Sequence, residues 1–434
     1  MKVTTESAVA GGGQARGRPK HVISSMHNAT RLAAPYRTVF LTTGLSRRDG
    51  GPFLSVSGLA RAVAGRGRGD VAVVGVYRSL ANWLVDREQW SGLAVEAAGL
   101  RRFRAVEFLR QRLEHHVCPG NPPAVIHLQG LWEAASLAVE RLGERRGARL
   151  VISPRGMLEP WALRHHQCRK QVALFLWQRR QLMQADLIHA TSLSEKQSIR
   201  NLGFRNPVCV IPNGVEIPAP WGGVARPIGA TGGDKGRFPL PGPSRPRRCL
   251  FLSRLHAQKG VPMLLEAWAR VRPTGWVLEI AGGGDDGHER EVGRQITARG
   301  LADVRLIGEV TGEAKWRFLS DAELFVLPSQ SENFGIAVAE AMGMGLPVIT
   351  TTATPWSVLQ RDRSGWWVEP AVDSLARAIR EATTESPTQL AERGRRGRDY
   401  VRDHFDWGGI GQRMDACYAW VTGNGPRPED VKLD

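Results

Sequence analysis

Residues 328–352, PSQSENFGIAVAEAMGMGLPVITTT, constrain the fold more than any other part of the chain. The apolar residues 323–328 suit a buried parallel strand, and the polar residues 329–333 suit a loop. Residues 335–344 have helical composition, and Pro347 begins a second apolar strand after a glycine turn. A strand, loop, helix and strand in this order predict an open α/β sheet.

Two carboxylates belong to this unit, Glu332 in the loop and Glu340 on the helix. Ligands of open α/β sheets bind where strands end, and the helix start at Gly335 suits a phosphate. The glutamates are therefore predicted to hold hydroxyl-rich groups on either side of the phosphates. The alternative is a solvated Glu332 and a Glu340 on the helix surface.

The same stretch resembles the signature of the retaining GT-B glycosyltransferases of family four, the glycosyl transferases group 1. The residues that carry the resemblance are Glu332, Phe334, Gly335, Glu340, Ala341, Met342, Gly345, Pro347, Val348 and Ile349. The resemblance implies an α/β fold with two doubly wound, Rossmann-like domains facing a central cleft. Segments such as PRGML at 154–158 and TPW at 354–356 resemble members that build bacterial surface polysaccharide or lipopolysaccharide.

In the second domain, the resemblance assigns a role to each matching position. Arg254 and Lys259, just past the predicted strand 249–252, would hold the diphosphate, whose growing charge needs fixed cations. Glu340 would bind the ribose hydroxyls. Catalytic roles thus fall to Glu332, Arg254 and Lys259. The remaining donor contacts would come from Asn333, Phe334, Gly335, Gly282, Gly283, Gly308 and Val310.

The glycines at 282, 284 and 287 also satisfy the dinucleotide pattern GxGxxG, so an NAD-dependent oxidoreductase is a further alternative. The match is weak, because residues 285–291 are polar and do not read as a tightly packed helix. A glycine turn near the donor phosphates is the preferred interpretation.

The resemblance implies that the first domain presents the acceptor beside Gly50, Gly51, Gln129 and Arg155. For the two glycines an ordinary turn is an equal alternative, and Arg155 could contact either the acceptor or a phosphate. The family often has a histidine where this chain has Gln129; an amide can hydrogen-bond a sugar hydroxyl but cannot carry a proton. His127 is expected to be a core histidine facing away from Gln129. Ser192 and Glu195 are predicted to form a helix capping box, which leaves Glu195 without a catalytic role.

The predicted domain organisation has five parts. A basic disordered tail spans 1–35, the acceptor-side domain 36–215 and a Pro- and Gly-rich linker 216–247. The nucleotide-sugar domain spans 248–404, and a C-terminal helix at 405–421 crosses back to the first domain.

The chain has 434 residues and a formal net charge of +17, which fits nucleic acid, an anionic membrane or a phosphate-rich substrate. An arginine-rich coding bias explains the charge equally well. Two basic helical stretches, 100–116 and 161–183, either lie on an anionic membrane or pack one face on the core. Five scattered cysteines without a CxxC pair argue against disulfides and zinc and favour a reducing compartment.

The sequence therefore predicts a cytoplasmic enzyme, with peripheral attachment to the inner face of the plasma membrane left open. It would transfer a hexose with retention from a UDP- or GDP-linked sugar to a saccharide or lipid-linked acceptor. No cofactor and no metal is expected. The alternatives are a nucleotide-sugar epimerase, the oxidoreductase above, and a basic membrane- or nucleic-acid-binding protein with an inactive site.

Overall fold

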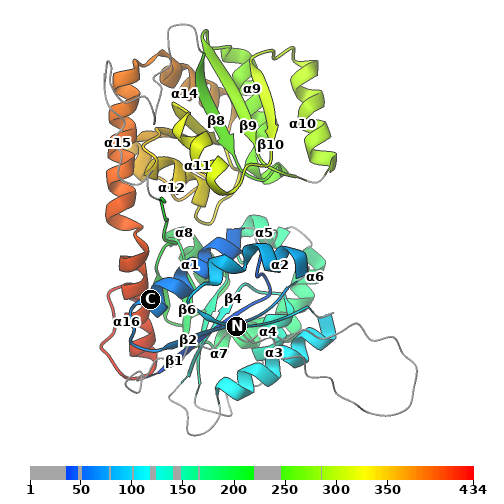
Figure 1. Ribbon diagram of the computed structural model, residues 1–434, viewed down its shortest axis with the longest axis vertical. Helices are drawn as coiled ribbons and strands as arrows, with labels where there is room; N and C mark the ends of the chain where they lie inside the picture. The colour runs from blue at the N-terminus through cyan, green and yellow to red at the C-terminus, as the bar shows by residue number, and fades with distance from the viewer. Residues whose placement is uncertain are drawn as a thin grey trace, which may run out of the picture. The chain divides into compact units, whose positions relative to one another are not determined.

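The computed structural model describes residues 36–46, 51–77, 80–99, 102–117, 124–139, 148–164, 167–218, 246–284 and 286–434. The predicted tail at 1–35, Gly50 and most of the predicted linker lie outside these residues. The chain forms two compact units. Unit 1 consists of the described residues up to Gly214 together with Trp407–Asp434, and unit 2 is Val215–Asp406 (Figure 1).

Unit 1 is built on a sheet in the order β14-β7-β6-β5-β4-β1-β2-β3, parallel except for the antiparallel pair β14 and β7. Strand β1 lies between β2 and β4, so the strand order reverses there. The strands are β1 (Arg37–Thr42), β2 (Asp70–Val76), β3 (Ala94–Ala98), β4 (Ala124–Gln129), β5 (Arg149–Ser153), β6 (Leu187–Ala190), β7 (Val208–Val210) and β14 (Val431–Lys432).

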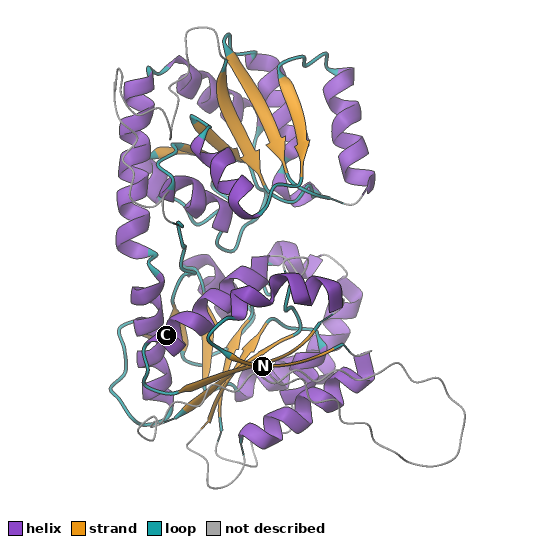
Figure 2. Ribbon diagram, viewed as in Figure 1, coloured by secondary structure: helices purple, strands orange, loops and turns teal. Residues whose placement is uncertain are grey.

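Helices cover both faces of this sheet (Figure 2). The side chains of β1 alternate between two core clusters, with Val39 and Leu41 in one and Phe40 in the other. Helices α3, α4, α7 and α8 complete the first cluster, and α1 and α16 complete the second. The helical segments are α1 (Gly51–Gly65), α2 (Leu80–Asp86), η2 (Arg87–Trp90), α3 (Arg102–His116), α4 (Ala134–Val139), α5 (Pro160–Arg164), α6 (Gln167–Ala173), η3 (Leu174–Gln178), α7 (Arg179–Gln184), α8 (Leu193–Asn201) and α16 (Trp407–Val421).

Unit 2 has a fully parallel sheet in the order β10-β9-β8-β11-β12-β13. Strand β8 lies between β9 and β11, which is the switch point of this unit. The strands are β8 (Arg247–Leu252), β9 (Trp276–Ala281), β10 (Val304–Gly308), β11 (Leu324–Leu327), β12 (Val348–Thr351) and β13 (Gly365–Val368). The helical segments are η4 (Ala257–Lys259), α9 (Val261–Val271), α10 (Asp286–Ala298), α11 (Gly312–Ser320), α12 (Ile336–Gly343), α13 (Val358–Arg361), α14 (Val372–Thr384) and α15 (Pro387–His404).

The predicted fold class of two doubly wound parallel sheets is confirmed, and the stretch 328–352 forms β11, α12 and β12 in the predicted order. Two local predictions are wrong. Most of the polar segment 285–291 belongs to α10, because Val292 and Ile296 suffice to bury one side of that helix. The sequence also predicts that residues 354–356 open a helix, but Trp356 is buried in the core and α13 begins only at Val358.

Candidate active site

The loops after β8 and β11 meet at the switch point of unit 2. Lys259 follows β8, and its Nζ donates a hydrogen bond to Oε1 of Glu332, which follows β11. The same oxygen accepts from Ser329 Oγ at 3.0 Å. Gln258 ties the two loops together, because its Nε2 donates to Ser331 O and its carbonyl accepts from Gln330 N, both at 2.7 Å. The structure thus brings the predicted Lys259 and Glu332 into direct contact.

Only glycine fits at position 260, next to this pair. Gly260 adopts a left-handed conformation (φ +72°), and a Cβ there would lie 2.1 Å from the carbonyl oxygen of Pro328. This close approach of the two loops sets where Lys259 emerges.

The α12 start matches the predicted phosphate site. Gly335 is the left-handed N-cap (φ +79°), and the first N–H groups of a helix lack intrahelical acceptors. Asn333 Oδ1 is buried there without a hydrogen-bond partner in the structure. Phe334 contributes to this site only through its backbone, since its ring packs 5.4 Å from those of Trp356 and Phe405, and its carbonyl accepts from Trp356 Nε1.

Glu340 is buried, which excludes the alternative of a surface helix residue. Its Oε1 accepts a hydrogen bond from Lys315 Nζ on α11 at 2.6 Å. Lys315 was not among the predicted site residues; the available signal was a lysine on α11, the helix that follows β10. The site therefore holds two lysine–glutamate pairs, Lys259 with Glu332 and Lys315 with Glu340.

Glycines bring the ends of β8, β9 and β10 together. Gly282 has φ +151°, and a Cβ there would lie 1.8 Å from Ser253 O. Its N–H donates to Gly308 O at 2.7 Å, and Gly283 O accepts from Leu255 N at 2.9 Å. Gly308 is also left-handed (φ +86°), whereas the half-buried Val310 packs against the core.

Arg254 follows β8 at this same edge, beside Ser253 and its contact with Gly282. Its side chain is exposed, and the structure records no ion pair between it and any described carboxylate. The predicted diphosphate cations thus differ: the guanidinium is available to a ligand, whereas the ammonium of Lys259 is already paired.

In unit 1, Arg155 and Gln129 are in direct contact. Arg155 follows β5 and has a positive φ of 57°. Its Nε and Nη2 donate to Gln129 Oε1 at 2.9 and 2.8 Å, and its Nη1 donates to Asn213 Oδ1 at 2.6 Å. Both acceptors are neutral amides. Burial lowers the pKa of Arg155 to about 10, so the guanidinium remains cationic at neutral pH.

Gln129 keeps one unsatisfied group. Its Nε2 is buried and has no partner in the structure, whereas its oxygen is taken by Arg155. An unpaired buried donor beside a cation suits an oxygen-rich ligand. The sequence predicts a loop over residues 44–52, but Gly51 is the first residue of α1, and Gly50 lies outside the described residues.

The contacts of Glu195 differ in part from the predicted capping box. Ser192 Oγ accepts from Glu195 N at 3.1 Å, which is half of the motif. The Glu195 carboxylate accepts instead from Gly156 N at 2.6 Å and from Thr191 N at 2.7 Å. The Glu195 carboxylate therefore holds the loop that carries Arg155, because the left-handed turn at Arg155 directs the N–H of Gly156 toward this carboxylate.

His127 is a core histidine, as predicted, but it does not face away from Gln129. Residues two apart on a strand share a face, and Val125 of β4 lies in the cluster covered by α16. His127 Nδ1 contacts Tyr418 Oη at 2.6 Å, and its Nε2 contacts Ser153 Oγ at 2.7 Å. Burial lowers its pKa well below the usual value, so it stays neutral.

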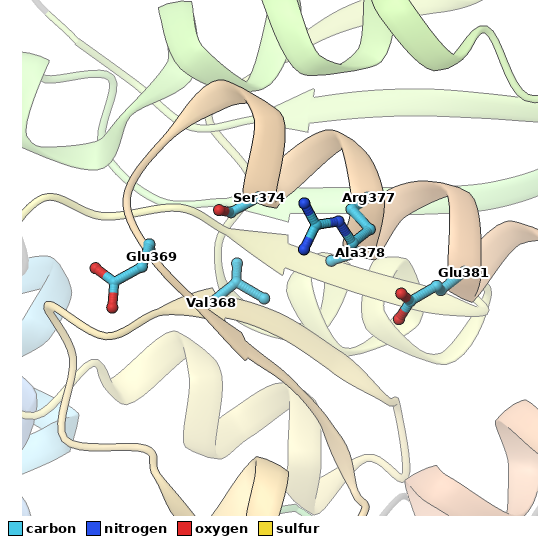
Figure 3. Close-up of a pocket in the computed structure, with 6 residues that line it drawn as sticks. All are labelled: Val368, Glu369, Ser374, Arg377, Ala378 and Glu381. Atoms are coloured by element: carbon cyan, nitrogen blue, oxygen red, sulfur yellow. The ribbon is translucent and has the colours of Figure 1, made fainter.

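Two further features concern metal binding and the pocket in unit 2 in the described part of the chain. No group of three His, Cys, Asp or Glu residues is arranged there to hold a metal ion. A pocket of about 210 Å³ lies between the end of β13 and α14, where Ser374, Arg377 and Glu381 come from the helix (Figure 3). It contains none of the predicted donor residues and is smaller than the roughly 300 Å³ at which ligand pockets begin.

Comparisons with known proteins support this arrangement. Residues 50–214 match the family described as Glycosyl transferase 4-like domain, and residues 246–385 match Glycosyl transferases group 1. The putative colanic acid biosynthesis glycosyltransferase WcaL of Escherichia coli K12 is 28% identical over 192 residues, which is 41% of this chain and 47% of that protein. The GDP-mannose:cellobiosyl-diphosphopolyprenol alpha-mannosyltransferase of Komagataeibacter xylinus is 28% identical over 183 residues, 41% of this chain and 46% of that protein. Each alignment thus spans less than half of the curated relative.

Solved structures agree on the fold. Anabaena HepE in complex with UDP and glucose superposes with a TM-score of 0.67 at 18% identity, covering 88% of this chain and 99% of that one. Sucrose-phosphate synthase from Thermosynechococcus elongatus gives a TM-score of 0.65 at 19% identity, covering 89% and 99%.

Two doubly wound units, with paired glutamates and cations at the strand ends of the second, define the GT-B class of glycosyltransferases. Within that class, the chain belongs to the glycosyl transferases group 1.

Proposed function

We propose that this protein transfers a hexose from a UDP- or GDP-linked sugar to a saccharide or lipid-linked acceptor, with retention, during cell-surface polysaccharide assembly. The observation that carries the proposal is the convergence of Arg254, Lys259, Glu332 and Glu340 around the switch point of unit 2 and the start of α12. Cations and free N–H groups suit a diphosphate, and carboxylates suit sugar hydroxyls.

The donor would lie across unit 2. The diphosphate would contact Arg254 and the α12 N–H groups, and Lys259 would reach it while keeping Glu332 oriented. Glu340, held by Lys315, would accept from the ribose hydroxyls. Gly282 and Gly308 would admit the nucleotide close to the backbone, where a side chain would block it.

The acceptor would contact unit 1. Arg155 is a half-buried cation whose hydrogen-bond partners are neutral, and the Nε2 donor of Gln129 beside it has no partner in the structure. This pair suits an acceptor that carries a phosphate next to its sugar, in line with the relative from Komagataeibacter xylinus, whose printed name contains a diphosphopolyprenol. A lipid-linked acceptor would place the enzyme at the inner face of the plasma membrane.

For the mechanism, we propose that the leaving diphosphate takes the acceptor's proton on the same face of the sugar. The phosphate-directed cations support this step, since they would stabilise the charge that develops on the leaving group. No resident metal is needed if these cations suffice, so activity should survive EDTA. Transfer is followed by NMR of the product's anomeric proton. An inverted product, or a glycosyl group trapped on a protein carboxylate, contradicts this mechanism.

The first experiment is thermal unfolding of the purified protein with a panel of UDP- and GDP-sugars, NAD and heparin. A ligand that binds the native state raises the unfolding temperature. We expect one nucleotide-sugar to do so, and Glu340→Ala and Arg254→Ala to abolish the shift. Arg294→Ala, on the exposed side of α10, is the matched control and should retain it.

Two outcomes of that experiment contradict the proposal. A shift with NAD alone supports the oxidoreductase, and a shift with heparin alone supports a basic binding protein. If a nucleotide-sugar binds but is converted to its epimer without any acceptor, the chain is an epimerase on the same scaffold.

A further inference from the structure

The helical segment at residues 160–184 in unit 1 exposes an unusual number of large apolar side chains. This segment, called the docking segment below, comprises α5, α6, η3 and α7. It buries two polar residues, Gln178 and Gln181, together with Ala173 and Leu182. Beside its polar and basic residues it exposes four large apolar side chains: Phe175 at 87%, Leu176 at 63%, Met183 at 61% and Val172 at 56%.

The π-helical turn η3 explains how both glutamines face inward. Ala173 and Gln178, five residues apart, are both buried, as one turn of a π-helix allows. Gln178 Oε1 then accepts from Trp132 N at 3.2 Å, and Gln181 Nε2 donates to Ser136 O at 2.6 Å. The inner side is therefore fully engaged, and the apolar residues are left on the outside.

These apolar residues form one stripe. Val172, Phe175 and Leu176 follow helical spacing, and Met183 comes seven residues after Leu176. Exposed apolar side chains that gather in this way mark a surface that contacts an apolar partner.

The docking segment is positively charged, which favours an anionic partner. Residues 160–184 contain no Asp or Glu. Two of its cations hydrogen-bond neutral carbonyls: Lys170 Nζ donates to Ala162 O at 2.5 Å, and Arg179 Nη1 donates to Leu202 O at 3.3 Å. Its basic residues are Arg164, Arg169, Lys170, Arg179 and Arg180.

We propose that the docking segment binds the surface of a membrane that contains anionic lipids, with Phe175 and Leu176 inserted among the acyl chains. Apolar residues flanked by cations are what such an interface attracts. A second copy of this chain is a poorer partner, because it would bring a surface of the same sign and each chain carries +17.

Helix α3, the other basic stretch of the chain, lacks these features. Its residues Ala105, Leu109 and Leu113 are buried in the core. Arg110 and Arg112 pair with Glu107 and Glu96 at 2.9 and 3.3 Å. It packs one face on the domain core, so it is not part of the proposed surface.

The docking segment contacts the loop that follows Gln129, one of the residues proposed to bind the acceptor. Trp132, which donates to Gln178, comes three residues after Gln129. A membrane under the docking segment would therefore lie next to the loop that is proposed to bind a lipid-linked acceptor. Only this link rests on the proposed function; membrane binding itself does not.

The test is cosedimentation of the full chain with vesicles of phosphatidylcholine alone or of phosphatidylcholine and phosphatidylglycerol in equal parts. We expect binding to the mixed vesicles at least about tenfold tighter than to the neutral ones, and weakened by salt. The double variant Phe175→Ser, Leu176→Ser should weaken binding by about tenfold or more. Leu433→Ser, which removes another exposed leucine of unit 1, should leave vesicle binding unchanged.

Both variants should keep the wild-type unfolding temperature, because the replaced side chains are exposed. Equal vesicle binding by the double variant and the wild type overturns the proposal. The proposal is also overturned if light scattering shows that the wild type is a dimer and the double variant a monomer, and neither protein binds vesicles. Vesicle binding is read without any nucleotide-sugar, so its failure is distinguishable from failure of the proposed transfer.

Discussion

At the scale of single residues, the two cations after β8 differ in whether they form an ion pair. Lys259 is paired with Glu332 and orients it, whereas Arg254 is exposed and has no recorded ion pair with the described carboxylates. A free guanidinium contributes to ligand binding and little to folding. Its removal should therefore separate activity from stability.

We predict that Arg254→Ala lowers kcat/KM for sugar transfer about 100-fold, because one charge-stabilising donor is lost at the leaving group. The unfolding temperature without ligand should not change. Steady-state kinetics and thermal unfolding measure the two effects. Arg294→Ala, an exposed arginine of the same unit, should change neither quantity. Full activity in Arg254→Ala would remove Arg254 from the site.

At the scale of elements, α12 is held in place by α15 through two glycines. A Cβ on Gly394, inside α15, would lie 1.8 Å from the carbonyl oxygen of Gly345, in the turn after α12. Backbone cannot move aside as a flexible side chain can. The helix that presents Glu340 therefore depends on the absence of a side chain in another helix.

We predict that Gly394→Ala destabilises the protein by about 1–3 kcal/mol, as overpacking does. Gly293→Ala in α10 is the matched control, because nothing lies within 4 Å of its Cβ position. It should stabilise by about 0.5–1 kcal/mol through helix propensity. Denaturant unfolding of both variants gives the comparison, and equal effects would contradict the packing of α15 on α12.

At the scale of the whole molecule, the chain leaves unit 1 at Gly214 and returns to it at Trp407. Helix α16 then supplies Ile410, Met414 and Tyr418 to the core of unit 1, and β14 extends its sheet beside β7. A buried hydrogen-bond chain runs from Tyr418 through His127, Ser153 and His189 to Ile211 O. It joins α16 to three strands of the sheet.

This chain of hydrogen bonds requires neutral histidines. His189 Nε2 donates to Ile211 O, so its Nδ1 must accept from Ser153 Oγ. Burial, the largest cause, lowers the pKa of His189 to about 3, against about 6.5 for an unfolded histidine. Between these pH values the unfolded state binds a proton that the native state does not.

The free energy of unfolding should therefore fall as the pH drops from about 6.5 towards 3, with His189 contributing about 1.4 kcal/mol per pH unit. The His189→Gln variant keeps a donor for Ile211 O but has no titrating group at position 189. The slope of its unfolding free energy against pH should therefore be shallower by that amount. Denaturant unfolding at several pH values measures the slope. An unchanged slope in His189→Gln would refute the assignment.

Much of the fold could be predicted from the sequence, because its strands are short apolar runs between glycine- and proline-marked loops. In the central stretch the expected strand, helix and strand occur in the predicted order, and the strand predicted at 249–252 lies within β8. The elements that were not predicted have weaker sequence patterns. The sequence analysis did not identify α2, β3, α4, α11 or β14; β14 has only two residues and exists because β7 offers it an edge.

The sequence by itself identified the residues of the candidate site. Glu332 and Glu340 belong to one strand–loop–helix pattern, and Arg254 and Lys259 follow another predicted strand. The family resemblance gave all four their expected roles. Tertiary structure alone decided their partners. Lys315 reaches Glu340, Glu195 holds the Arg155 turn, and the docking segment turns Phe175 outward because residues distant in the chain meet there. Spacing along the chain cannot encode such pairings, since burial and hydrogen-bond geometry arise only when the sheets and helices pack.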